Sequence, residues 1–227
     1  MCGKFTQLVR WEDAAEFSGG LPVIADDEPS VFATPMRSAK IIRLGEDGSP
    51  ELVPMRWGFC NPEAAAFKPD HMHARSETID SRPTFAESFA ERRGVLLVET
   101  FNEAEDLPGG KRRQWVIRPK DRKPIPIAVI WEDWEGPEGS FPCFVMITTP
   151  PSALIGRVTD RMPAILPRED WPVWLGETEA SAQEIKALLR TFEDGGNWEM
   201  AEQQAAKKKA DAPPKAKAKA KPQMDLF

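Results

Sequence analysis

The sequence predicts a single α+β domain built on a largely antiparallel, barrel-like sheet with flanking helices, followed by a disordered tail. Three observations favour this class. Short apolar runs bounded by turn residues recur through the middle of the chain, which is typical of buried strands. Helical patterns flank these runs instead of alternating with them. The 227 residues are 41% hydrophobic and include eight Trp and twelve Phe, which is sufficient for one sizeable core.

The first predicted element is a short helix over residues 6–17, with an apolar stripe on one face and two glycines after it. Each later helix also places its apolar side chains on one face. The predicted helices after the first cover residues 83–93 and 178–192. The predicted strands cover residues 39–44, 51–59, 94–101, 114–118, 125–131 and 141–149.

Composition changes near residue 201, where Ala, Lys and Pro begin to dominate. We therefore predict a domain over residues 2–200, a disordered linker over 201–222 and a terminal peptide over 223–227. Residues 201–227 hold seven Lys and three acids, a net charge of +4, so the rest of the chain carries −10. An acidic domain is not the usual footprint of a nucleic-acid binder, and any nucleic-acid site on it must be a local groove.

Cysteine usage and hydropathy indicate the compartment. The three cysteines cannot all pair within the chain and show no metal-ligand spacing, which fits a reducing cytoplasm. No signal peptide precedes Cys2, and no apolar run approaches the length of a membrane span. We expect a cytoplasmic monomer without a membrane partner, a metal or an organic cofactor.

Cys2 is the most informative residue, because removal of Met1 makes it the N-terminus. It would then carry an amine with a pKa of about 7.7–8.0 next to a thiol with a pKa of about 8.5. Both groups are partly nucleophilic near neutral pH. Such an aminothiol forms an imine with an aldehyde, and the thiol then closes a thiazolidine ring. The alternative is that Cys2 is a small hydrophobe near a frayed terminus.

Three polar segments are further candidates for chemistry. In residues 73–78, Arg75 is either a phosphate ligand beside an acid–base group or half of an ordinary Arg–Glu pair. The acids of residues 99–105 form either a solvated turn or a proton shuttle with one desolvated carboxylate. Asp160-Arg161 followed by Met-Pro indicates a buried ion pair at a tight bend.

Taken together and in order, these segments resemble the SOS-response-associated peptidase (SRAP) domain family over roughly residues 2–175. The resemblance implies a protein that binds single-stranded DNA at abasic sites. It also implies a covalent thiazolidine between the N-terminal Cys and the opened sugar, and autoproteolytic release of Met1. The matching motifs are Met1-Cys2-Gly3-Lys4-Phe5, Trp57-Gly58-Phe59, Ala74-Arg75-x-Glu77-Thr78, Phe101-x-Glu103 and Asp160-Arg161-Met162-Pro163.

The resemblance implies a role for each matching position. Cys2 is the crosslinking residue, and Glu103 moves protons during imine formation and crosslink reversal. Lys4 and Arg75 occupy phosphate-binding positions, and Arg161 lies in a motif that borders the site and is a further DNA contact. Pro35 matches a proline of the DNA-binding loop.

Two positions depart from the family pattern. His73 stands where the family usually has Asn, and Thr159 stands where it usually has His. Either the imidazole has moved across the pocket, with His73 and Thr159 as catalytic residues, or the chemistry is altered. Residues 61–67 also replace a Trp-rich loop, which removes stacking platforms for bases and leaves the DNA-binding mode open.

The last five residues resemble the clamp-binding peptide of bacterial replication and repair proteins. Gln223 matches its polar position, and Leu226 and Phe227 match its apolar pair. A sliding clamp is therefore an expected partner, and the tether would hold the domain near replicating DNA in the nucleoid. The alternative is a fortuitously apolar terminus.

Two other function classes remain open. The chain is either an N-terminal-nucleophile amidase or peptidase, with Cys2 attacking an amide, or a non-catalytic module that binds DNA and the clamp. The first predicts activity without DNA, and the second predicts no crosslink. We expect an abasic-site processing enzyme of the crosslinking, lyase or peptidase-type hydrolase class.

Overall fold

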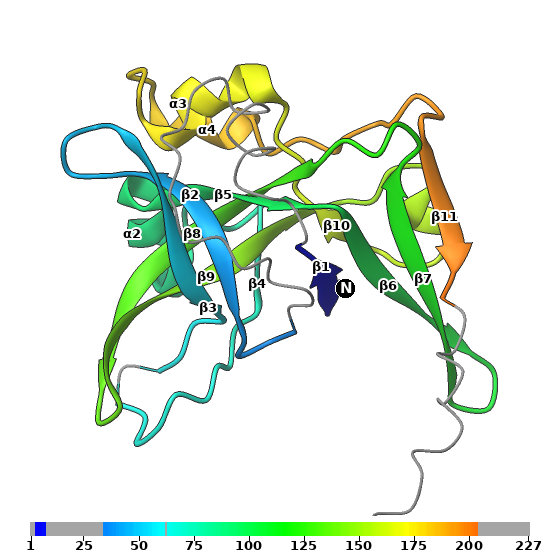
Figure 1. Cartoon of the computed structure of the whole chain (residues 1–227), viewed down its shortest axis with the longest axis horizontal. Coiled ribbons are helices and arrows are strands. Elements are labelled where there is room, and N and C mark those ends of the chain that lie inside the picture. Colours follow the sequence, from blue (N-terminus) through cyan, green and yellow to red (C-terminus); the bar gives the residue numbers. More distant parts are fainter. Residues whose placement is uncertain (1–2, 8–33, 62, 204–227) are drawn as a thin grey trace, which may run out of the picture.

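The computed structural model describes residues 3–7, 34–61 and 63–203. Within these ranges the chain is mostly strand and forms two sheets, with helices on the outside of the larger one (Figure 1). The predicted α+β class with a largely antiparallel, barrel-like sheet is confirmed. None of the described helices is long and apolar enough to cross a membrane.

The larger sheet closes on itself. Strands β9, β3, β2, β5 and β8 pair in that order, and β8 pairs with β9 to complete a five-stranded ring. The β3–β9 pair is parallel and the other pairs of the ring are antiparallel. Two short strands, β4 and β10, extend the sheet along β9. Their bounds are β2 Ser38–Leu44, β3 Pro50–Trp57, β4 His73–Arg75, β5 Arg93–Val98, β8 Ile125–Gly136, β9 Gly139–Thr149 and β10 Met162–Pro163.

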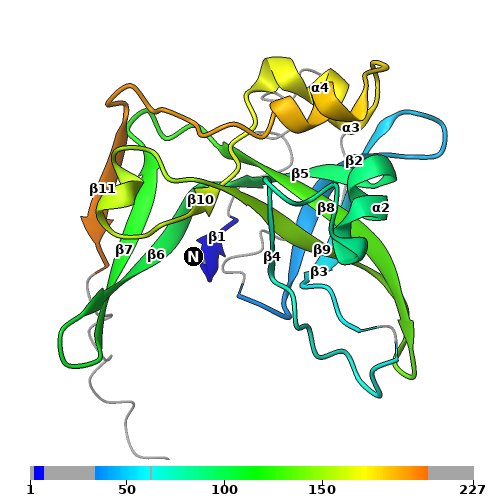
Figure 2. The same cartoon turned by 180° about the vertical axis from the view of Figure 1, so that it is seen from behind.

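The smaller sheet is antiparallel and has the strand order β1-β6-β7-β11. Its strands are β1 (Lys4–Thr6), β6 (Thr100–Leu107), β7 (Lys111–Pro119) and β11 (Trp198–Glu202). Figures 1 and 2 show β1 between the barrel and the rest of this sheet. The side chain of Gln7 fixes this position: its amide donates to the carbonyls of Lys40 and Leu97 and accepts from the Lys40 N–H, all at 2.9–3.1 Å.

The helices are short. They are α2 (Pro83–Glu91), α3 (Trp171–Leu175), α4 (Ala182–Ala187) and the 3-10 turns η1 (Ile155–Arg157) and η2 (Arg168–Asp170). In α2, Phe85 and Phe89 are buried on one face, as the apolar spacing predicts. Arg93 joins α2 to α3 because its guanidinium donates to the carbonyls of Phe89 (2.9 Å) and Trp174 (2.6 Å) at their C-terminal ends.

Both faces of the barrel strands are buried. One apolar cluster, which includes Val95 and Val145, packs under the helices. A second cluster, which includes Leu96 and Met146, faces β1 and the smaller sheet. Alternate residues of each strand therefore enter different cores. This explains why the strands appear in the sequence as continuous apolar runs instead of alternating patterns.

Three predicted elements need correction. The run at 94–101 is two strands, because the Glu99 N–H donates to Thr6 O (2.9 Å) and the chain passes there from the barrel to the smaller sheet. The helix predicted at 178–192 is only α4, since Ser181 and Glu184 form a capping box that starts it at Ala182. Thr6 ends a strand and does not begin a helix, and residues 8–17 lie outside the described residues.

The C-terminal boundary of the fold passes the predicted residue 200. β11 continues to Glu202, and the Gln203 N–H donates to Gln114 O at 2.7 Å. The predicted linker from residue 204 onward and the peptide 223–227 lie outside the described residues.

Candidate active site

The described start of the chain lies beside Glu103. β1 pairs with β6 so that Lys4 is opposite Asn102 and Phe5 is opposite Phe101. Glu103, the next residue of β6, is 1% exposed, and Lys4 is half-buried. Cys2 lies outside the described residues, two positions before Lys4. The carboxylate predicted to move protons is therefore buried where the N-terminal strand begins.

Trp57 connects three motifs that are far apart in the sequence. Its ring centroid lies 5.1 Å from that of Phe5 and 5.8 Å from that of His73, and its ring is edge-on to His73. The indole N–H donates to Met72 O at 3.0 Å, and the ring is fully buried. The N-terminal motif, the Trp-Gly-Phe motif and the His-Ala-Arg segment thus meet at one side chain.

The glycine after Trp57 is required by geometry. Gly58 has a φ of +119°, a conformation that L side chains rarely adopt. A Cβ atom there would also lie 2.4 Å from Cβ of Pro69. The middle residue of the Trp-Gly-Phe motif is therefore Gly, because the chain makes a close turn directly beside the site.

The loop that carries Pro35 lies against the same tryptophan. The Met36 N–H donates to Trp57 O (3.0 Å), and the Trp57 N–H donates to Arg37 O (2.9 Å). Met36 has a φ of +71° and is 54% exposed, and Arg37 is exposed as well. The sequence analysis named Pro35 as a candidate, and the structure adds Met36 and Arg37 as candidates because they lie exposed beside Trp57. A basic residue and an apolar residue directly after that proline were the available signal.

β4 presents His73 and Arg75 from the edge of β9. It pairs with β9 in parallel, with His73 opposite Met146 and Arg75 opposite Thr148. His73 is half-buried next to Trp57, whereas Arg75 is exposed. Arg75 is therefore available to a ligand from solvent.

Arg161 is committed to contacts within the protein. It is 8% exposed, and its guanidinium grips both carboxylate oxygens of Glu77, with 2.9 Å from Nη2 to Oε2. Nη2 also donates to Thr148 O at 2.6 Å. These bonds hold the pKa of Glu77 below its usual range. Glu77 pairs with Arg161 and not with Arg75. The buried ion pair expected within the Asp160-Arg161 bend is wrong, because Arg161 reaches across the fold to Glu77, whose side chain is 47% exposed, and Asp160 is exposed.

The Asp-Arg-Met-Pro motif and the Ala-Arg motif meet at β9. Thr148 is opposite Arg75 in β4 and opposite Pro163 in β10. Thr159 is half-buried just after η1, and its N–H donates to Ile155 O (3.2 Å). Thr159 precedes Arg161 of the Arg161–Glu77 pair by two residues in the sequence. Gln223, Leu226 and Phe227 lie outside the described residues.

Comparisons with known proteins identify the family of the chain. The family model "SOS response associated peptidase (SRAP)" matches residues 1–207. The abasic site processing protein YoqW of Bacillus subtilis is 29% identical over 200 residues, covering 85% of this chain and 88% of its own. The abasic site processing protein HMCES of Gallus gallus is 26% identical and covers 69% of this chain and 55% of its own.

Solved structures show the same fold. A protein from Bordetella bronchiseptica superposes with a TM-score of 0.75 at 21% identity, covering 90% of this chain and 100% of its own. One from Bacteroides thetaiotaomicron gives a TM-score of 0.73 at 22% identity, covering 89% and 92%. With a family model that spans nearly the whole described fold, the chain belongs to the SRAP family.

Proposed function

We propose that this protein processes abasic sites in DNA, and that it does so by forming a covalent thiazolidine between Cys2 and the abasic sugar in single-stranded DNA. Its relatives named as abasic site processing proteins support the substrate. The observation that carries the proposal is the register of β1, which starts the described chain beside the buried Glu103. Two peptide units span at most about 7 Å, so chain connectivity keeps Cys2 near Lys4.

The proposed reaction has two steps. After release of Met1, in which the thiol itself takes part, the free amine of Cys2 attacks the aldehyde and one water leaves, giving an imine. The thiol then adds across the C=N bond and closes the ring without a further leaving group. Glu103 takes and returns the protons of these steps. His73, held edge-on to Trp57, supplies the titratable imidazole that moves a proton during opening of the sugar, and Thr159 supplies a hydroxyl.

The DNA backbone is proposed to follow the exposed cations around this site. Arg75 is exposed at the end of β4, Arg37 is exposed beside Pro35, and Lys4 is half-buried in β1. Each phosphate contact adds salt-sensitive affinity that does not depend on sequence. We assign Arg161 a positioning role, because its donors already hold Glu77 and Thr148 and so fix β4 against β9.

The loop at residues 61–67 lacks the tryptophans expected for base stacking. The exposed Met36 and the adjacent Pro35 supply an apolar surface in their place. Met36 lies next to Trp57 through paired backbone hydrogen bonds, so it is fixed near the site although its side chain is 54% exposed. An apolar side chain in this position suits contact with the face of an unstacked base. We therefore propose that the single-stranded DNA crosses residues 35–37.

The test is intact mass after incubation with single-stranded DNA that carries one abasic aldehyde. The expected product is the Met-free protein plus DNA minus one water, stable without a reducing agent. Cys2→Ser should give no stable adduct, while Cys60→Ala, which removes a buried internal thiol, should crosslink normally. An abasic analogue without an aldehyde should remain free. A stable adduct with Cys2→Ser, or a mature protein that retains Met1, would exclude the mechanism.

The crosslinking experiment and a turnover assay on small amides together separate the alternative functions. An N-terminal-nucleophile amidase would hydrolyse small amides without DNA and would form an acyl-enzyme. A non-catalytic module would bind the DNA and give no covalent product at any time.

We also propose that the terminal peptide docks on a bacterial sliding clamp. The sequence Gln223-Met-Asp-Leu-Phe227 at the end of a Lys-rich segment supports this partner. The double variant Leu226→Ala/Phe227→Ala should lose clamp pull-down and still crosslink, and Lys217→Ala is the control outside the peptide. Retained clamp binding in the double variant would contradict the assignment.

A further inference from the structure

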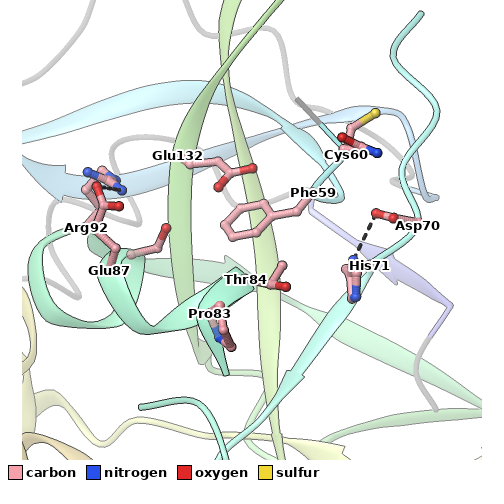
Figure 3. A pocket seen from close by; sticks show the side chains of 11 residues that line it. Phe59, Cys60, Asp70, His71, Pro83, Thr84, Glu87, Arg92 and Glu132 are labelled. Carbon is pink, nitrogen blue, oxygen red and sulfur yellow. Dashed lines mark hydrogen bonds and ion pairs between the residues drawn. The ribbon is translucent and has the colours of Figure 1, made fainter. Parts of the chain in front are cut away.

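A cavity of about 420 Å³ lies apart from the residues assigned to abasic-site chemistry. It is bounded by α2, by β8 and by the chain that follows β3 (Figure 3). Phe59, buried to 2% exposure, lines its centre. Neither Glu103 nor His73 nor Arg75 lines it, so the proposed DNA chemistry leaves this cavity unexplained.

Acidic side chains outnumber basic ones on the cavity wall. Asp70, Glu87 and Glu132 line it together with one cation, Arg92. Arg92 is already shared, because it pairs with Glu87 (2.9 Å) and donates to the carbonyl of Trp131. Within the described residues no Lys, Arg or His nitrogen lies within 4.0 Å of the Glu132 carboxylate. The cavity is thus negative and unsuited to a phosphate.

Glu132 projects into the cavity from β8 and is half-buried. Its contact within the protein is the Cys143 thiol, 4.0 Å from Oε1. A partly desolvated carboxylate is costly unless a cation compensates it. Glu132 therefore supplies an anchor for a positive group that enters the cavity.

Across Phe59 from Glu132 lies a second polar point. His71 Nδ1 and Asp70 Oδ1 are 2.9 Å apart, and Figure 3 shows this pair on the side of the phenyl ring away from Glu132. The two polar ends are separated by an apolar middle. No three His, Cys, Asp or Glu side chains among the described residues converge as metal ligands. The wall therefore suits an extended organic cation better than a single metal ion.

We propose that this cavity binds a linear aliphatic dication, with one nitrogen on Glu132, its hydrocarbon chain along Phe59 and its second nitrogen on the Asp70–His71 pair. Ammonium groups donate several hydrogen bonds to carboxylates. The methylene chain is stabilised by the burial of its apolar surface against the ring of Phe59. This site is independent of the proposed DNA chemistry, and neither assignment depends on the other.

The probe for the test is putrescine, titrated calorimetrically into the full chain, with n-butylamine as a matched ligand that lacks the second nitrogen. We expect saturable one-to-one binding of putrescine and at least tenfold weaker binding of butylamine. Glu132→Gln and Asp70→Asn should each weaken putrescine at least fivefold. Glu46→Gln, which removes an exposed carboxylate from the β2–β3 turn, should change the Kd by less than twofold.

The pH dependence provides a second readout. Burial raises the pKa of Glu132 to about 7. The ionised fraction of Glu132, and with it the affinity for putrescine, should therefore increase from pH 6 to pH 8. The charged or titratable groups that interact electrostatically with Glu132 are Arg92, Glu87, Asp133, Asp70 and Cys143.

Three outcomes would overturn the proposal. They are the absence of saturable binding at 10 mM putrescine, equal affinity for butylamine, and equal weakening by Glu46→Gln and Glu132→Gln. Equal weakening would indicate a general charge effect. Crosslinking to abasic DNA should proceed unchanged in Glu132→Gln, so failure of this site is distinguishable from failure of the proposed DNA chemistry.

Discussion

Replacement of Glu132 by Gln should stabilise the protein at alkaline pH and leave its stability unchanged in acid. Burial raises the pKa of this carboxyl from 4.5 to about 7 in the folded protein. The positive charge of Arg92 opposes the shift, and the carboxylates of Glu87, Asp133 and Asp70 add to it. Gln has the shape of the neutral acid and never ionises, so it isolates the cost of the charge.

The sign follows from proton binding. Between pH 4.5 and 7 the folded protein holds a proton on Glu132 that the unfolded chain has released, so the free energy of unfolding falls as pH rises. Above pH 7 the loss is complete. A shift of this size corresponds to at most about 3.4 kcal/mol. Because the side chain is only partly buried, solvent screening reduces this, and we expect about 1–2 kcal/mol.

The assay is urea unfolding followed by tryptophan fluorescence at pH 4 and pH 8. The Gln variant should equal the wild type at pH 4 and exceed it by about 1–2 kcal/mol at pH 8. Glu46→Gln should stay within about 0.5 kcal/mol of the wild type at both pH values, because Glu46 is exposed. A variant difference that is the same at both pH values, or a less stable Gln variant at pH 8, would refute the reasoning. A carboxylate kept in a cavity at a cost in stability is also what a ligand-binding role predicts.

Three further predictions concern contacts that stabilise the fold. Arg161→Ala should destabilise the protein by about 2–3 kcal/mol, less than for a fully buried pair because Glu77 is 47% exposed. This loss of stability, measured by urea unfolding, should shrink as pH falls below 4.5, because Arg161 stabilises the ionised form of Glu77. A loss that is independent of pH would contradict this role. Gly58→Ala should cost about 2 kcal/mol or more from its positive φ and its contact with Pro69, and an unchanged melting temperature would be the opposite result. Arg93→Met should cost about 1–3 kcal/mol in urea unfolding because two helix C-termini lose their donors, and a loss below about 0.5 kcal/mol would show that water replaces them.

The sequence alone predicted the class of fold and most of its strands. Strands in 39–44, 125–131 and 141–149 were recognisable because local apolar runs reflect burial on both faces, which needs no knowledge of partners. α2 was recognisable from Phe85 and Phe89, since helical spacing is also local. The motif residues and their order indicated the SRAP family, which the family model confirms.

Tertiary structure decided which of these local elements meet. The closure of the barrel depends on the parallel β3–β9 pair, whose partners lie 87 positions apart at Arg56 and Cys143. The Arg161–Glu77 pair spans 84 positions, and sequence spacing favoured a nearer partner for each of the two residues. The cavity at Glu132 depends on the packing of α2 against β8, which no local pattern encodes. Periodicity reports the environment of each residue, whereas the identity of its neighbours depends on how the whole chain closes.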